Sequence, residues 1–213
     1  MGKRSAVLDL AASQSKLSSL LSDADVVLLG YSPGSLHRFG LSPEQLERDY
    51  PHLIIGCLSA WGWSGPWMNH AGFDSIVQAA SGIAAECGAP PGSSGAPGVI
   101  KPGALPVQAL DHSSGLLLAA GLLDLLSQKL SGRVEVSLIG AAERLFSYPR
   151  VAVGEPATTS RDASLTIPCA YGLVTIPPPP VLLNGNYLTG KILRYGESRP
   201  EWQNMGLLHV LSI

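Results

Sequence analysis

The stretch Asp25-Val-Val-Leu-Leu-Gly30 is a continuous apolar run that ends at a glycine. Such a run is typical of a strand that is buried on both faces of a sheet. A second run of the same kind follows at Leu53-Ile-Ile-Gly-Cys-Leu58. Between the two runs, Ser42 and Gln45 have the spacing of a capping box, and Pro43 stands at the first helical position. Strand, helix and strand at these short intervals predict a parallel α/β sheet.

Periodic patterns predict further elements on both sides of this core. The expected elements are a strand at 5–10, helices at 14–22 and 74–86, a helix from Asp111 to about Lys129, and a half-buried strand from Arg133 to Leu138. Residues 88–105 are rich in Gly, Pro and Ser and are expected to form a long loop. We expect one domain over residues 1–150. The tail at 151–213, with four consecutive prolines at 177–180, is expected to be irregular.

Composition excludes several classes of function. The chain has 213 residues, of which 46% are apolar and 14% charged, with a net charge of −2. These values argue against a nucleic-acid partner and against a basic membrane-binding face. So little charge indicates surfaces that are covered, either in an obligate oligomer or by the rest of a larger protein. The run from Leu116 to Leu126 is shorter than the roughly 20 residues that span a bilayer. We therefore expect a soluble, cytoplasmic protein, with a mitochondrial or peroxisomal location also compatible.

The usual motifs for phosphate loops and metal sites are absent from the sequence. It contains no G-x-G-x-x-G and no Walker sequence. Its five histidines and three cysteines lack metal-ligand spacing, so we expect neither a metal site nor a disulfide framework. Trp61, Trp63 and Trp67 lie in a loop after a predicted strand, a position that suits packing or ligand binding.

One carboxylate stands out, in the stretch Gln108-Ala-Leu-Asp111-His-Ser-Ser-Gly115. Asp111 comes at the start of a helix that is otherwise almost wholly apolar. Aspartate is among the commonest helix caps, because its oxygens accept backbone N–H bonds and its charge favours the positive end of the helix. The same position suits a carboxylate nucleophile at the rim of a cleft. Both readings are open on these residues alone.

Seven short motifs occur in an order that resembles a known family. They are Gly2–Leu10, Asp23–Val27, Ser32–Leu36 with Arg38, Leu58–Gly62 with Gly65-Pro66, Gly72–Gly82, Ala109–Asp111 and Gly132–Leu138. Together they resemble the family III CoA-transferases, the CaiB/BaiF family, over about residues 2–147.

The resemblance implies a Rossmann-like parallel sheet flanked by helices, and a dimer of two interlinked chains. It also implies transfer of CoA from an acyl-CoA donor to a carboxylic acid, with CoA as substrate and no permanently bound cofactor. Asp111 matches the family nucleophile, which forms an aspartyl–acyl anhydride and then an aspartyl–CoA thioester. Arg4 and Arg38 match residues that contact CoA and would bind its phosphates. The backbone N–H groups of residues 113–115 are expected to stabilise charge on the thioester oxygen.

Phe73 and Asp74 are expected beside the CoA. Asp74 either hydrogen-bonds near the active site or caps its helix. Racemases of the family carry a histidine at the position of Phe73, and phenylalanine accepts no proton, so racemisation is the least favoured activity. Family members also carry a strand–turn–helix before the match and a second domain after it, so the chain is expected to be incomplete. A non-catalytic member that binds CoA weakly or pairs with a full-length relative is the alternative.

Overall fold

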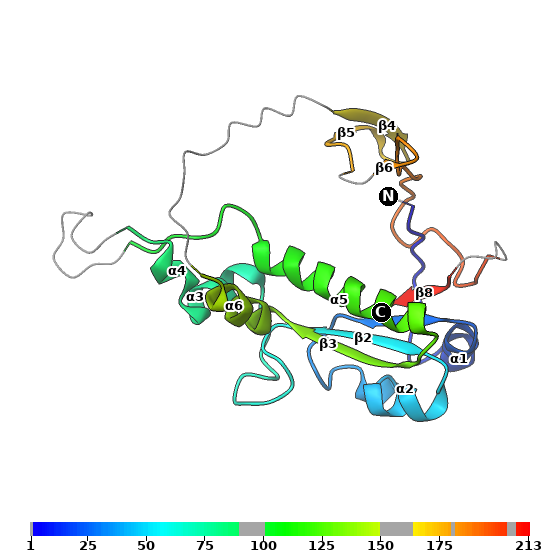
Figure 1. The fold of residues 1–213 in the computed structure, drawn as a ribbon. Helices are drawn as coiled ribbons and strands as arrows, with labels where there is room; N and C mark the ends of the chain where they lie inside the picture. The colour runs from blue at the N-terminus through cyan, green and yellow to red at the C-terminus, as the bar shows by residue number, and fades with distance from the viewer. Residues whose placement is uncertain (1, 90–100, 150–163, 180–181, 204–207) are drawn as a thin grey trace. The chain divides into compact units, whose positions relative to one another are not determined.

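The computed structural model describes residues 2–89, 101–149, 164–179, 182–203 and 208–213. These residues form two compact units (Figure 1). One unit combines Met1–Leu17 with Val151–Gln203, and the main unit combines Ser18–Arg150 with Asn204–Ile213. This division departs from the expected 1–150 and 151–213 at both ends, because the N-terminal segment groups with the tail and the C-terminal segment with the sheet.

The main unit is built on a parallel sheet in the order β3-β2-β1-β8. Its first three strands are β1 (Val26–Leu29), β2 (Ile54–Ser59) and β3 (Gly132–Ser137). β1 and β2 lie where the apolar runs predicted them, β3 lies where the alternating pattern predicted a strand, and the predicted parallel α/β class is confirmed. β1 and β2 are almost wholly buried, as expected for strands covered on both faces.

The fourth strand comes from the segment that was predicted to be irregular. β8 (Val210–Ser212) pairs in parallel with β1, with Val26 opposite Val210. The Asp25 carboxylate accepts a hydrogen bond of 2.8 Å from the His209 backbone N–H, and the Asp25 N–H donates to the His209 carbonyl at 2.9 Å. A strand of three residues is too short to show a period, so its partner strand determines its conformation.

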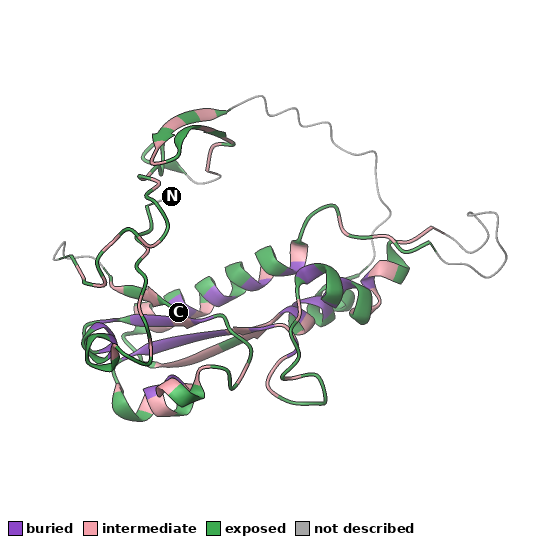
Figure 2. Ribbon diagram, turned by 180° about the vertical axis from the view of Figure 1, so that it is seen from behind, coloured by how far each residue is buried: buried purple, intermediate pink, exposed green. Residues whose placement is uncertain are grey.

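Helix α5 (Ala109–Gln128) covers one face of the sheet and α2 (Pro43–Asp49) lies on the other (Figure 1). α5 is buried on the side that faces the strands and exposed on the opposite side (Figure 2). Two of its buried leucines, Leu118 and Leu122, pack with Val26 and Ile54. The predicted cap of α2 is confirmed, because the Ser42 hydroxyl accepts a 3.2 Å hydrogen bond from the Gln45 N–H.

α5 begins two residues earlier than predicted. The helix starts at Ala109, so Asp111 lies inside the first turn and is not the cap. The first-turn N–H groups take other acceptors, including the Gln108 carbonyl for His112. Of the two readings of Asp111, the helix cap is therefore excluded, and its side chain is exposed.

Three helices form a small cluster at the carboxyl ends of the strands: α3 (Asp74–Ser81), α4 (Ile83–Glu86) and α6 (Leu138–Ser147). The single helix predicted at 74–86 is divided at Gly82, whose φ of +94° interrupts the helical path. α6 was not predicted, although Leu138, Ala141 and Ala142 have the spacing of a buried helical face.

The other unit consists of short hairpins. β4 (Leu165–Cys169) pairs with β5 (Gly172–Ile176), and β6 (Leu182–Leu183) pairs with β7 (Asn186–Tyr187). The predicted strand at 5–10 is wrong, because it makes only an isolated bridge from Ala6 to Glu197. α1 (Gln14–Ser22) has the bounds that were predicted. The predicted 88–105 loop lies largely outside the described residues.

α5 is also long and apolar enough to cross a membrane by length and composition, which the shorter apolar run had not predicted. Length and composition are weak support for a membrane span, because core helices of soluble proteins satisfy the same criteria. The contacts of α5 with β2 and β3 identify it as a helix that covers a sheet.

The same substitution at two glycines of α5 should change the free energy of unfolding in opposite directions. A Cβ at Gly121 would come 2.8 Å from Cγ1 of Val134, a stiff side chain on β3, whereas a Cβ at Gly115 meets nothing within 4 Å. We expect Gly121→Ala to lower the free energy of unfolding by about 1–2 kcal/mol through overpacking. Gly115→Ala should raise it by about 0.5–1 kcal/mol, because alanine favours the helix. Urea unfolding of both variants measures the difference, and an equal response would contradict this packing.

Candidate active site

Asp111 lies at the edge of the sheet where ligands bind in open α/β folds. α5 runs antiparallel to the strands, so its N-terminal turn lies at their carboxyl ends (Figure 1). The Asp111 side chain is exposed. In the part of the chain that the structure describes, no group donates a hydrogen bond to its carboxylate. The carboxylate is therefore available to a reactant.

A second carboxylate, that of Asp74, is hydrogen-bonded to the backbone of Asp111. Asp74, the first residue of α3, is 0% exposed. Its Oδ2 accepts a 2.9 Å hydrogen bond from the Asp111 backbone N–H, and its Oδ1 accepts one of 2.5 Å from Nε2 of Gln78. The other end of that amide, Oε1, accepts a 2.9 Å bond from the Leu105 N–H. Burying a carboxylate is costly, and these bonds offset that cost.

The environment of Asp111 raises the pKa of its carboxyl group above the ordinary value. Partial burial is the largest cause, the negative charge of Asp74 adds to it, and His112 acts in the opposite direction. Among the described residues these are the charged groups that act on Asp111, one from α3 and one from α5 itself.

A buried hydrophobic cluster around Trp61 holds the helices that carry the two carboxylates. Trp61 follows β2, is 9% exposed and packs with a buried cluster that includes Val77 and Leu110. Its indole N–H donates to the Ala71 carbonyl at 3.4 Å. A Cβ at Gly72 would come 2.5 Å from Cβ of Ala60 and 2.8 Å from the Trp61 indole nitrogen. Only glycine therefore allows the chain to enter α3 this close to Trp61.

The structure brings together three of the five predicted site residues. Phe73 precedes Asp74 at the start of α3 and is 70% exposed, so it lies at the same corner as Asp111. Arg38 lies on the exposed 3₁₀ turn after β1, where its guanidinium carbon is 4.6 Å from the centre of the Phe39 ring. Arg4 is exposed and belongs to the other unit.

The expected stabilisation of the thioester oxygen by residues 113–115 is wrong. Ser113, Ser114 and Gly115 lie inside α5, beyond its first turn, where each N–H is used within the helix. The hydroxyl of Ser114 is fully buried and has no hydrogen-bond partner among the described residues. Oxyanion donors therefore do not come from this segment.

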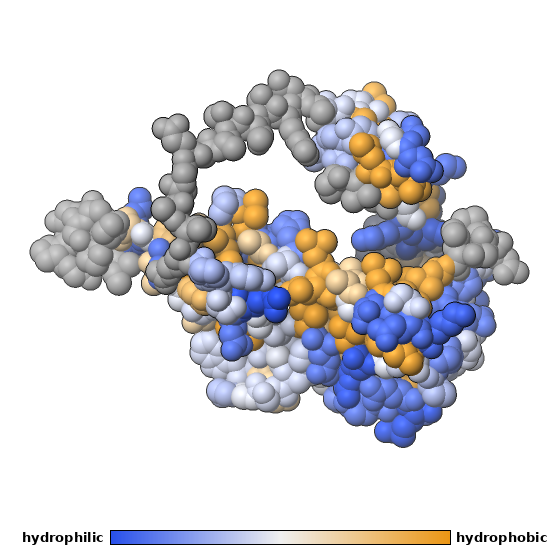
Figure 3. All heavy atoms as spheres, viewed as in Figure 1, coloured by the Kyte–Doolittle hydropathy of each residue, from blue (hydrophilic) through white to orange (hydrophobic). Residues whose placement is uncertain are grey.

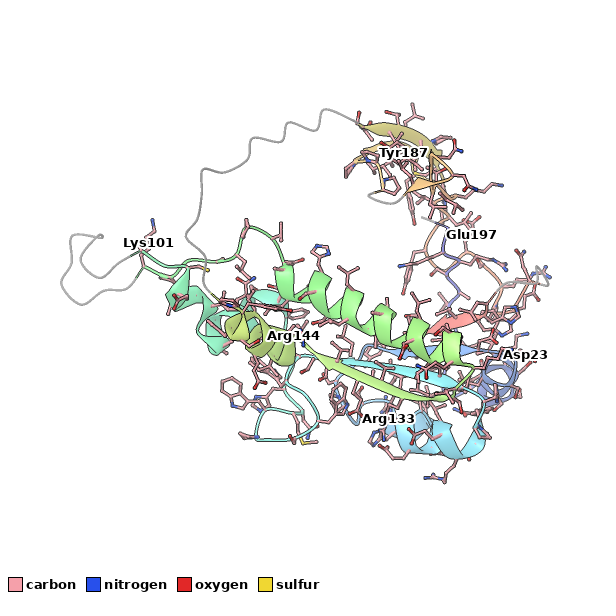
Figure 4. All side chains as sticks on the ribbon, viewed as in Figure 1. Asp23, Lys101, Arg133, Arg144, Tyr187 and Glu197 are labelled. Carbon is pink, nitrogen blue, oxygen red and sulfur yellow. The ribbon has the colours of Figure 1, made fainter. Side chains whose placement is uncertain are left out.

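Sequence reasoning missed a charged hollow on the α2 side of the sheet. A cavity of about 570 Å³ opens at the carboxyl ends of β1 and β2 and is bordered by Tyr31, Cys57 and Arg133, among others. Arg133 of β3 points toward α2 (Figure 4) and contacts three glutamates: Glu44 at 2.6 Å, Glu47 at 3.2 Å and Glu135 at 3.3 Å. The Arg133 guanidinium lowers the pKa of Glu44. The alternation of Arg133 and Glu135 along one strand was the signal for this cluster.

Gln78 was also missed, although it follows Asp74 by four residues, the spacing that brings side chains together on a helix. No cluster of three or more His, Cys, Asp or Glu side chains in the described ranges is arranged to hold a metal ion.

Comparison with known proteins agrees with this geometry. The family described as CoA-transferase family III matches residues 1–164. The chain belongs to CoA-transferase family III. The four-stranded parallel sheet and its covering helices are the fold of the solved relatives.

The chain is similar to several named relatives. It is 36% identical over 138 residues to the probable fatty acyl-CoA transferase Rv3272 of Mycobacterium tuberculosis, a match that covers 63% of this chain and 33% of the relative. It is 36% identical over 93 residues to the acetyl-CoA:oxalate CoA-transferase of Acetobacter aceti, covering 43% of this chain and 24% of that one. The chain thus spans about a third of the first relative and a quarter of the second.

Solved structures give the same picture. A crystal structure of Rv3272 from M. tuberculosis matches with a TM-score of 0.57 and 33% identity, over 68% of this chain and 40% of that one. A CaiB/BaiF family protein from Brucella suis matches with a TM-score of 0.54 and 20% identity, over 80% and 47% of the two chains. At that identity the second match supports the fold alone.

The reactivity of the cysteines tests the burial of Cys57 at the border of this cavity. Burial raises the pKa of the Cys57 thiol to about 12, so at pH 8 it is almost entirely protonated and unreactive. Cys87 is exposed. We expect iodoacetamide at pH 8 to label Cys87 first and Cys57 only after denaturation, as peptide mass spectrometry would reveal. Rapid labelling of Cys57 in the folded protein would contradict its burial.

Proposed function

We propose that this chain transfers CoA from an acyl-CoA to a carboxylic acid, with Asp111 as the nucleophile. The Asp111 carboxylate attacks the thioester carbon and expels the CoA thiolate, which leaves an aspartyl–acyl anhydride. The thiolate then attacks the aspartyl carbonyl and releases the donor acid, which leaves an aspartyl–CoA thioester. The acceptor carboxylate reverses both steps: it forms a new anhydride, and the thiolate takes the acceptor acyl group and regenerates Asp111.

The observation that carries this proposal is the exposed Asp111 carboxylate at the carboxyl edge of the sheet, in a chain of this family. An ionised carboxylate needs no general base, and in the described residues no donor hydrogen-bonds to its oxygens and lowers its reactivity. The raised pKa is consistent with this role, because a more basic carboxylate is a stronger nucleophile.

Arg4, Arg38 and Phe73 remain proposed contacts of CoA. An exposed arginine suits phosphate through charge-assisted hydrogen bonds, and Arg38 lies on the loop that follows β1 at the ligand-binding edge. Phe73 presents an exposed ring and directly precedes Asp74, which hydrogen-bonds to the Asp111 backbone. Since a phenyl ring takes no proton, the racemase alternative has no acid–base partner at this position.

Trapping the covalent intermediate tests the proposal. We expect the protein, mixed with a panel of acyl-CoA thioesters, to gain the mass of CoA minus water on the peptide that contains Asp111. Hydroxylamine should remove this adduct, since it cleaves thioesters. Asp111→Asn should abolish both the adduct and CoA transfer, because an amide is a far weaker nucleophile than a carboxylate.

Asp124→Asn is the matched control, because Asp124 is an exposed carboxylate on the same helix. It should form the adduct at the wild-type rate. Transfer that survives Asp111→Asn, or an adduct on another residue, would overturn the proposal. Exchange of the substrate α-proton with deuterium, without CoA transfer, would support racemisation instead.

A second candidate is a chain that works only when another chain covers it. α5 exposes an apolar stripe on its outer side, with Leu116 73% and Leu123 63% exposed and Ala119 and Ala120 between them. Apolar residues form a broad patch over α5 (Figure 3). Stripes of this kind mark protein–protein contacts. A homodimer, or pairing with a longer relative, would cover it.

Charge placed on this stripe tests the second candidate. We expect the wild-type chain to form a dimer in light scattering, and Leu116→Lys with Leu123→Lys to form a monomer, because burying two ammonium groups opposes association. Leu182→Lys with Leu183→Lys, at exposed positions of the other unit, is the control and should leave the dimer intact. A monomeric wild-type chain would exclude the homodimer.

A further inference from the structure

The buried carboxylate of Asp74 and the side chain of Gln78 together link three segments of the chain. The Asp111 N–H reaches it from α5, Gln78 reaches it from the next turn of α3, and Gln78 also binds the Leu105 N–H in the segment that leads into α5. Leu105 and Asp111 lie 27 and 37 positions from Gln78 and Asp74 in the sequence. The bonds therefore tie the start of α5 to α3 at two points.

The direction of these hydrogen bonds requires a carboxylate at position 74. The Leu105 N–H must bind an oxygen, so the Gln78 amide turns its Oε1 to Leu105 and its NH₂ to Asp74. The Asp111 N–H approaches Asp74 from the other side. Two donors thus converge on Asp74, and asparagine, with one oxygen and one NH₂, cannot accept from both sides.

The same bonds replace a missing cap. Gln108 precedes α5 but its side chain makes no capping hydrogen bond. The carboxylate of Asp74 instead binds a first-turn N–H of α5 from outside the helix. The height and rotation of the turn that carries Asp111 are therefore determined by α3, which is itself held against the Trp61 core.

We propose that Asp74 and Gln78 are positioning residues that hold the Asp111 backbone at the distance the acyl transfer needs. This inference rests on the proposed function, in which Asp111 is the nucleophile. Asp74 is 0% exposed, so it acts through Asp111 and does not touch CoA. A misplacement of a reacting group by about 1 Å costs about 100-fold in rate, so even partial loss of these bonds is measurable.

Exchanging the carboxylate of Asp74 and the amide of Gln78 tests the inference. Asp74→Ala removes both acceptors and should lower kcat about 100-fold while KM for acyl-CoA changes little. Asp74→Asn keeps one acceptor and should lower kcat about tenfold. Adding Gln78→Glu to Asp74→Asn restores every bond: the glutamate accepts from the Leu105 N–H and the Asn NH₂, and the Asn oxygen accepts from the Asp111 N–H. This double variant should recover most of the wild-type kcat.

The pH profile separates the charge of Asp74 from its hydrogen bonds. The charge of Asp74 raises the pKa of Asp111, His112 lowers it, and no other charged group from the described elements around α5 acts on it. Removing the charge in Asp74→Ala lowers the Asp111 pKa. The acid limb of kcat should therefore move to lower pH in Asp74→Ala, although kcat itself falls. Asp124→Asn, a charge change farther along α5, should change neither the acid limb nor kcat itself.

Each outcome decides the inference. Equal kcat in Asp74→Ala and wild type would overturn it, as would a double variant no more active than Asp74→Asn. If Asp74→Ala does not fold, the comparison of Asp74→Asn with the double variant remains decisive.

Amide hydrogen exchange distinguishes this failure from a failure of the proposed function. Exchange at the start of α5 should be faster in Asp74→Asn and slower again in the double variant, whether or not the protein forms an adduct. Unchanged exchange with an intact wild-type adduct would refute the positioning role alone. Altered exchange without any wild-type adduct would refute the nucleophile alone.

Discussion

The hydrogen bond from the Asp111 N–H to the buried carboxylate of Asp74 connects the first turn of α5 to the core. Through it, the first turn of α5 depends on α3, and α3 depends on the close approach of Gly72 to Trp61. A buried carboxylate is stable only with full hydrogen bonding, so the bond also constrains the segment around Leu105 through Gln78. The turn that carries the exposed Asp111 carboxylate is thus hydrogen-bonded to the buried side chain of Asp74.

The two faces of α5 differ in what they contact. The inner face, with Leu118 and Leu122, packs on the sheet and holds the helix along the strands. The outer face exposes Leu116 and Leu123 to solvent in this chain. The first turn of the same helix carries Asp111, so α5 bears both the candidate nucleophile and the exposed apolar stripe.

Much of the main unit was predictable, and two of the errors have a physical cause. β1, β2 and α1 were found because long apolar or amphipathic runs carry a clear period. β8 is three residues long and forms by pairing with β1, and the break at Gly82 depends on a single positive φ. α6 carried a recognisable pattern that was overlooked. Asp111 was identifiable from its motif, whereas the roles of its neighbours were not.

The sequence by itself determined the class of fold and the family, and it singled out Asp111 as the candidate nucleophile, because these follow from local patterns and from ordered motifs. Tertiary structure alone decided that Asp111 lies within the helix and not at its cap, that Asp74 is buried beneath it, and that Gln78 completes the connection. These relations join residues 27 to 37 positions apart. Only chain folding brings such groups within hydrogen-bond distance, and only burial makes their pairing obligatory.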